Sequence, residues 1–104
     1  MSFFFFSIPE SMKPIFVNPV VYVLELEGDS DHDMYFYIGA SMNLNTRLAQ
    51  HFMGQGAKFC KRHAPKRIRE VIWVEGEALD VEDATTMKYI QQFGAERVRG
   101  GRYC

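Results

Sequence analysis

The sequence predicts one α/β (α+β) domain, in which a small three-stranded sheet, antiparallel or mixed, is flanked by helices in the order β-β-α-β-α. The chain has 104 residues, the size of a single domain. Its 47% hydrophobic and 24% charged residues are close to the globular average, which disfavours disorder of the whole chain. Two short runs rich in β-branched and aromatic residues are followed by a segment with helical spacing of its apolar residues. A third run of the same kind comes next, and a second segment with helical spacing follows that run.

Residues 1–19 are expected to form an extended arm, because three of the four prolines lie there. The folded domain is then expected over residues 20–104. The four phenylalanines at residues 3–6 lack the basic flank of a signal peptide. The apolar run at residues 15–26 is shorter than the roughly 20 residues that span a bilayer. We therefore expect a cytoplasmic protein without a membrane segment.

Residues 20–26 have the β-branched and aromatic content of a strand. Residues 27–33 are polar and predict a turn, and residues 34–39 predict a second short strand. Together the three segments predict a hairpin.

A helix is expected to begin after a cap at Ser41 or Asn43 and to end near Met53. Its predicted buried stripe follows helical spacing and consists of Leu44, Leu48 and Phe52. A basic connector then leads to a third strand at about residues 68–74. A second long helix is expected to begin at the cap Asp80 and to end at Gly94.

The net charge of −1 conceals a strong segregation of charge along the chain. Residues 40–69 contain seven basic residues and no acid, whereas acids cluster on both sides of this segment. Such a segment predicts a patch that binds a polyanion. A solvated, salt-bridged surface is the alternative interpretation. The candidate nucleic-acid-binding residues are Lys58, Lys61, Arg62, Lys66 and Arg67.

Arg47 and His51 lie at positions i and i+4 of the first predicted helix, beside its apolar stripe. A guanidinium and an imidazole are therefore expected to project together from the rim of the buried face. Spacing alone leaves open an amphipathic boundary with a snorkelling arginine and a satisfied histidine.

The segment from Val20 to Arg69 resembles the start of a GIY-YIG nuclease domain. Tyr37-Ile38-Gly39 matches the second half of that motif, and Val20-Val21-Tyr22 keeps the tyrosine of the first half. The arginine and histidine of the following helix share the family's four-residue spacing. The tail Val98-Arg99-Gly100-Gly101-Arg102-Tyr103 is similar to a subgroup with a Val-Arg-Gly-Gly-x-Tyr ending.

The resemblance implies an endonuclease that hydrolyses DNA phosphodiester bonds with the help of Mg²⁺ or Mn²⁺. The site residues that it implies are Tyr22, Tyr37, Arg47, His51 and Glu82. The resemblance to this subgroup, in which the acid precedes the tail as Glu82 does, implies Glu82 as the metal ligand, and a carboxylate suits a hard divalent cation that prefers oxygen ligands and retained waters. Asp83 beside it is the next candidate, and a carboxylate that favours the helix dipole is the structural alternative.

The remaining roles follow from the chemistry of each side chain. Arg47 offers a planar, permanently charged fork to the phosphate oxygens. Tyr22 is implied as general base, which requires a neighbouring cation to lower the pKa of its phenol. Tyr37 would orient the water, and His51 would orient a phenol or relay the proton.

Two alternatives come from other classes of protein. Cys60, His63, His51 and Cys104 form a weak zinc pattern, since a second compact pair of ligands is missing. The other alternative is a catalytically silent nucleic-acid-binding or interaction module on the same fold. Within the nuclease hypothesis, nicking, structure selectivity, the monomeric or homodimeric state and a role in repair, recombination or defence all stay open.

Overall fold

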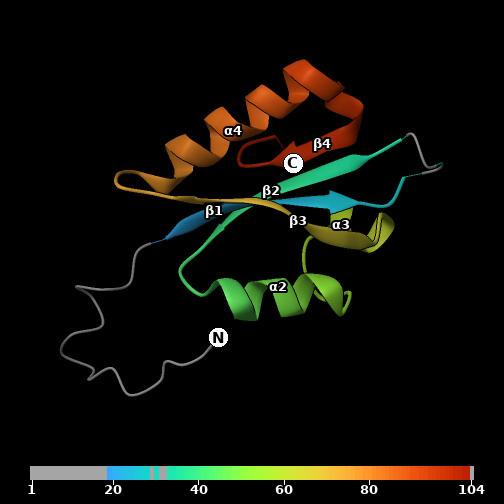
Figure 1. Cartoon of the computed structure of the whole chain (residues 1–104), viewed down its shortest axis with the longest axis horizontal. Coiled ribbons are helices and arrows are strands. Elements are labelled where there is room, and N and C mark those ends of the chain that lie inside the picture. Colours follow the sequence, from blue (N-terminus) through green and yellow to red (C-terminus); the bar gives the residue numbers. More distant parts are fainter. Residues whose placement is uncertain (1–18, 29, 31–32, 104) are drawn as a thin grey trace.

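The computed structural model describes residues 19–28, 30 and 33–103, which form three layers (Figure 1). Most of the predicted N-terminal arm lies outside these residues. The elements in chain order are β1 (Val20–Leu26), β2 (Tyr35–Ser41), α2 (Leu44–Phe52), α3 (Lys58–Arg62), β3 (Pro65–Trp73), α4 (Ala78–Phe93), a 3₁₀ turn η2 (Ala95–Arg97) and β4 (Val98–Gly100).

The sheet is mixed and has the strand order β3-β1-β2-β4. β1 pairs antiparallel with both β2 and β3, and β4 pairs parallel with β2. The prediction of an α+β domain with a mixed sheet and flanking helices is therefore confirmed. The prediction of three strands is wrong by one, because β4 has only three residues, too few to show strand alternation.

β1 is the central strand, and all seven of its residues are buried. Alternate side chains of this strand enter two apolar cores, one on each face of the sheet. Burial on both faces accounts for the nearly continuous apolar run in this part of the sequence. The exception is Glu25, whose carboxylate binds Arg67 at 2.8 Å and Arg69 at 3.1 Å.

The helices are divided between the two faces. α4 covers the face that carries Val21 and Val23, whereas α2 and α3 cover the face that carries Tyr22 and Leu24. In Figure 1 the orange helix α4 lies above the sheet and the green helix α2 lies below it. Side chains at alternate positions of β1 therefore face different helices.

Helix α2 begins at the predicted cap, where Asn43 Oδ1 accepts a hydrogen bond from the backbone of Thr46. Its predicted buried stripe is only partly correct. Leu44 and Leu48 pack against the core, but Phe52 is 48% exposed and the fully buried residue of the helix is His51. A residue eight positions after Leu44 has rotated about 80° around the helix, out of the buried face.

Helix α4 begins three residues earlier than predicted, since its cap is Glu77, so Asp80 lies in the first turn and is not the cap. A carboxylate in that turn still interacts favourably with the helix dipole. Gly94 ends the helix as predicted, with a φ of 97° that favours glycine. Among the described residues, no helix is long and apolar enough to cross a bilayer.

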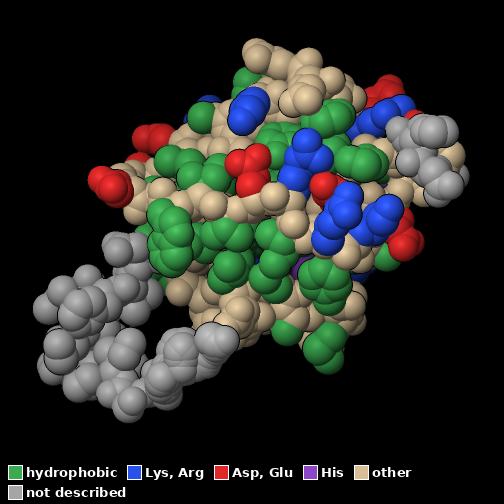
Figure 2. All heavy atoms as spheres, in the orientation of Figure 1, with side chains coloured by type: hydrophobic (Ala, Val, Ile, Leu, Met, Phe, Trp, Pro, Cys, Tyr) green, Lys and Arg blue, Asp and Glu red, His purple; other side chains and the backbone are tan. Residues whose placement is uncertain are grey.

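Strand β3 is an edge strand of the sheet that the described residues form, and it carries an exposed apolar strip. Ile68, Val71 and Trp73 pair with Leu24, Tyr22 and Val20, so they lie on the α2 side of the sheet. They are 42%, 38% and 76% exposed. Figure 2 shows hydrophobic side chains across the middle of the molecule, where β3 passes in front.

Candidate active site

Two tyrosines of the hairpin face helix α2. Tyr22 of β1 pairs with Gly39 of β2, and Tyr37 of β2 pairs with Leu24 of β1, so the two rings are diagonal neighbours on one face. Their centroids are 6.4 Å apart, and the His51 ring lies 5.7 Å from Tyr22 and 5.1 Å from Tyr37. The three rings form a cluster under the helix.

Two glycines make room for this cluster. A Cβ on Gly39 would lie 2.4 Å from the hydroxyl oxygen of Tyr22, and a Cβ on Gly56 would lie 2.1 Å from Nδ1 of His51. Real Cβ atoms almost never come so close to other atoms. The glycine of Tyr37-Ile38-Gly39 is therefore required by the position of the tyrosine on the neighbouring strand.

His51 is fully buried and holds the Tyr22 hydroxyl, with 2.7 Å between Nε2 and Oη. Its Nδ1 accepts a long hydrogen bond of 3.4 Å from the backbone N–H of Ala57. A backbone N–H can only donate, so the proton of the neutral ring lies on Nε2 and is donated to Tyr22. Burial, aided by the charge of Arg47, lowers the pKa of His51 to about 4. The imidazole is therefore neutral at pH 7.

Arg47 lies one turn before His51 on α2, on the side of the tyrosines. One of its nitrogens donates to Gln50 Oε1 at 2.9 Å. Burial lowers the pKa of Arg47, but hydrogen bonds and electrostatic attraction to Tyr22 and Tyr37 outweigh this effect and the net pKa is raised. The guanidinium is a fixed positive charge beside both phenols.

The pKa of Tyr22 is raised, first by burial and then by repulsion from Tyr37, while Arg47 acts in the opposite direction. In the protein alone, Tyr22 is therefore protonated at neutral pH. Its oxygen nevertheless faces two donors, Arg47 and Nε2–H of His51. Both donors would favour the phenolate once the proton leaves.

Glu82 is not part of this cluster, because it belongs to α4 on the other face of the sheet. Its Oε2 accepts a hydrogen bond of 3.1 Å from the backbone of Gly101. Gly101 follows Gly100, the β4 partner of Ile38, so the carboxylate lies at the end of the β2–β4 pair toward Gly39. Burial raises the pKa of Glu82, and Asp83 adds to the effect.

Asp83 makes different hydrogen bonds from those of Glu82. Its two carboxylate oxygens accept hydrogen bonds of 2.9 Å from the backbone and the guanidinium of Arg102. These bonds lower the pKa of Asp83. Asp83 therefore anchors the C-terminal tail, whereas Glu82 has one carboxylate oxygen that makes no hydrogen bond with the described residues.

The zinc alternative has no support in the described residues, which contain no group of three His, Cys, Asp or Glu able to hold a metal ion. Cys104 lies outside them. Cys60 is buried in the core beside Tyr22, and burial raises its pKa to about 12. His63 stacks on Tyr35 with 3.9 Å between the ring centroids.

The predicted basic segment is divided by the fold. Lys58, Lys61 and Arg62 belong to the short helix α3, in a segment that was predicted to be a basic connector. Lys66 and Arg67 belong to β3. Arg67 binds Glu25, which lies on the same side of β1 as Val23, facing α4, so this ion pair lies away from the tyrosine cluster.

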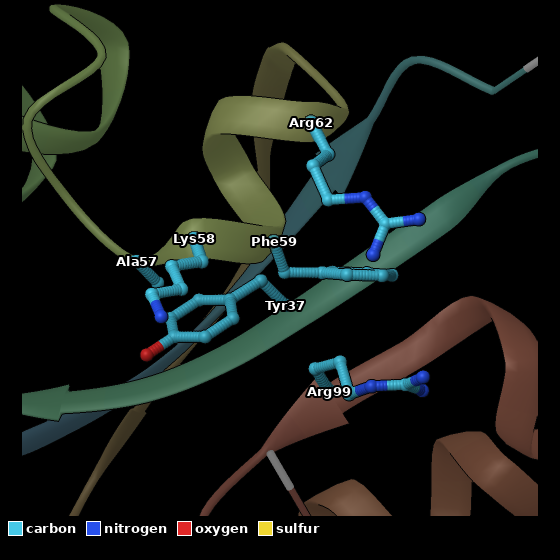
Figure 3. A pocket seen from close by; sticks show the side chains of 6 residues that line it. All are labelled: Tyr37, Ala57, Lys58, Phe59, Arg62 and Arg99. Atoms are coloured by element: carbon cyan, nitrogen blue, oxygen red, sulfur yellow. The ribbon is translucent and has the colours of Figure 1, made fainter.

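A cavity of about 390 Å³ lies beside the cluster and is lined by Tyr37, Ala57, Lys58, Phe59, Arg62 and Arg99 (Figure 3). Arg99 belongs to β4 and was not among the predicted site residues. Its position depends on a strand pairing between residues about 60 positions apart in the chain. The spacing of residues along the chain does not predict such a pairing. The Val-Arg-Gly-Gly-x-Tyr motif was the sequence feature that drew attention to this segment.

Two tyrosines of adjacent strands in a mixed sheet thus lie beneath a helix that bears an arginine and a histidine. The sequence pattern of the GIY-YIG catalytic domain matches residues 18–93, and the chain belongs to this family. Membership supports a nuclease-type function and a nucleic-acid substrate, and nucleases of this family generally depend on a divalent metal ion. No curated protein and no solved structure matches the chain significantly.

Proposed function

We propose that the protein is an Mg²⁺- or Mn²⁺-dependent DNA endonuclease that uses one active site to cut one strand at a time. The observation that carries this proposal is the Tyr22 hydroxyl, buried between His51 Nε2 and the Arg47 guanidinium. A buried phenol ordinarily needs one hydrogen-bond partner, whereas this oxygen faces two donors. Two donors on one oxygen are what a phenolate requires.

Tyr22 would act as the general base. Its raised pKa makes the phenolate rare in the protein alone, so the phenol would first lose its proton to solvent water, and the positive charge of Arg47 would favour this loss. The N–H of His51 then holds the oxygen in place, and because this ring is neutral it does not repel Arg47. Tyr37, on the same face, would orient the attacking water.

Arg47 would stabilise the charge that develops on the phosphate. Its fork can contact two phosphate oxygens and remains protonated throughout the reaction. The hydrogen bond to Gln50 fixes the guanidinium on the side of the phenols before substrate arrives. Such preorganised donors typically supply about 100- to 1000-fold in rate.

Glu82 would hold the divalent ion. A partly buried carboxylate with one oxygen available fits a hard cation that keeps several waters and takes further oxygens from the substrate phosphate. When bound, the ion supplies charge neutralisation and assistance to the leaving 3′-oxygen. The carboxylate must be ionised, and its raised pKa makes this requirement sensitive to acid.

The test is cleavage of matched linear, nicked, flap and four-way-junction DNAs, each with Mg²⁺ and with EDTA. Arg47→Ala, purified in the same way, is the control for contaminating nucleases. We expect Mg²⁺-dependent cleavage that the variant lacks. Binding without cleavage of any substrate would instead support a catalytically silent nucleic-acid-binding module.

A further inference from the structure

The cavity beside Tyr37 is formed by three parts of the chain. α3 contributes Lys58, Phe59 and Arg62, β2 contributes Tyr37, and β4 contributes Arg99. Figure 3 shows the Phe59 ring extending between the side chains of Arg62 and Arg99. The volume of about 390 Å³ lies within the roughly 300 to 1000 Å³ of small-ligand sites.

The cavity carries positive charge that no carboxylate of its lining balances. Lys58, Arg62 and Arg99 line it, and none of them forms an ion pair with a described residue. Arg99 donates from one nitrogen to the backbone carbonyls of Ala95 and Val98, which hold the guanidinium without neutralising it. Three unbalanced cations around one concave site favour an anionic occupant.

The cavity also carries an aromatic surface that is held in place. The Phe59 ring lies 5.8 Å from the Tyr35 ring and 4.9 Å from the His63 ring, and the Arg99 guanidinium carbon lies 5.2 Å from its centroid. Tyr37 supplies a second ring on another wall. A site that bound phosphate alone would not need these rings, whereas a nucleobase stacks on them.

We propose that this cavity binds one unpaired nucleotide of the DNA strand that is cut, with its base against Tyr37 and Phe59 and its phosphate near Lys58, Arg62 and Arg99. The proposal rests on the proposed function, because Tyr37 belongs both to the cavity and to the tyrosine cluster. The nucleotide would therefore lie next to the scissile phosphate.

The proposal selects a class of substrate. A base within a duplex is stacked on both faces, and extruding it costs a few kcal/mol that an unpaired base does not require. The enzyme should therefore prefer flaps, overhangs or branched DNA, in which a nucleotide next to the cut is already unpaired. Fully paired DNA should be bound mainly through its phosphates.

The test measures binding in EDTA, so it does not depend on cleavage. The probes are a single-stranded oligonucleotide containing 2-aminopurine and a hairpin duplex with the same number of phosphates. The central variant is Arg62→Ala, and its matched control is Lys61→Ala, which removes the same charge from the next residue of α3, outside the cavity. Both residues are exposed, so the fold should survive.

We expect Arg62→Ala to weaken the single-stranded probe about tenfold and the duplex about twofold, and Lys61→Ala to weaken both equally and slightly. Phe59→Leu keeps apolar volume but removes the ring, and it should abolish the change in 2-aminopurine fluorescence on binding. Thermal melting checks that each variant is folded.

Equal effects of Arg62→Ala and Lys61→Ala on both probes would overturn the proposal, as would a wild-type protein that binds the duplex more tightly. Competition by micromolar thymidine monophosphate would assign the cavity to a free nucleotide instead. If the expected binding differences are found but no DNA is cut, the proposed nucleotide site stands and only the proposed nuclease activity is disproved.

Discussion

The Tyr22 hydroxyl accepts a hydrogen bond of 2.7 Å from Nε2 of His51, between two residues that are both fully buried. A buried hydroxyl that accepts from a neutral imidazole has its own proton available for another partner. Tyr22 can therefore still donate or release that proton while His51 holds its oxygen.

Tyr22→Phe separates catalysis from packing, because it removes only the hydroxyl. It should reduce turnover by about 100- to 10,000-fold, as is typical of acid-base groups. It should also cost about 1 to 3 kcal/mol of stability, because Nε2–H of His51 loses its buried acceptor. Tyr37→Phe should have the smaller effect on rate. Normal turnover with a lowered melting temperature would exclude Tyr22 as the base.

Arg47→Ala should lower the cleavage rate about 100- to 1000-fold while preserving the fold. Because the Arg47 charge lowers the pKa of His51, the same variant should raise that pKa, as followed by NMR titration of the imidazole. Gln50→Ala is the comparison variant: it keeps the guanidinium but removes its hydrogen-bond partner, so it should lower the rate less than Arg47→Ala does. An unchanged rate in Arg47→Ala would remove it from the proposed site.

Glu82→Gln should abolish Mn²⁺ binding, measured by calorimetry, together with metal-dependent cleavage. Asp83→Asn is the matched control and should retain both, because Asp83 is occupied by Arg102. Since burial raises the pKa of Glu82, metal binding should weaken on acidification at a higher pH than for an ordinary glutamate. Metal binding that is lost in Asp83→Asn and kept in Glu82→Gln would move the ligand to Asp83.

The stability of the protein should fall as the pH is lowered from about 6.5 to about 4. Over this interval the unfolded chain protonates His51, while the folded protein, in which the pKa is about 4, does not. The loss from this group should reach about 3 kcal/mol. Denaturant unfolding at several pH values tests this, with His51→Gln expected to show a smaller decrease. An equal decrease in the variant would contradict the buried, neutral histidine.

Gly39→Ala should displace the Tyr22 ring, because the added Cβ would overlap its hydroxyl. We expect a cost of about 1 to 3 kcal/mol, typical of overpacking, and a reduced cleavage rate. Gly76→Ala is the matched control, since a Cβ there meets nothing within 4 Å and its backbone is not strained. The melting temperatures of both variants measure this cost of stability. A Gly39→Ala protein with the wild-type melting temperature would show that the Tyr22 ring can move freely.

Local sequence was sufficient for most of the fold. Strand β1 begins and ends where its β-branched run does, and α2 begins after the predicted Asn43 cap. The burial of Phe52 was mispredicted, because an i, i+4, i+8 stripe drifts around the helix and one helix cannot show which face meets the sheet. In its place the structure fully buries His51, which helical spacing placed only at the rim of the buried face.

The parts that sequence could not predict depend on contacts between distant segments. Arg99 joins the wall of the cavity only through the pairing of β4 with β2. The ion pair of Arg67 with Glu25, 42 residues earlier, likewise removes one cation from the predicted basic surface. The number of basic residues in a segment does not reveal which of them will form ion pairs with acids from distant segments.

The parallel pairing of β4 with β2 also affects how the molecule forms and opens. The residues of the tyrosine cluster lie within one hairpin and the helix that follows it, a local unit that can assemble early. β4 is three residues long and pairs with residues about 60 positions earlier in the chain, so we expect it to pair late in folding and to open more easily than the hairpin. A molecule whose tail has opened would lose one wall of the cavity while its tyrosine cluster stays intact.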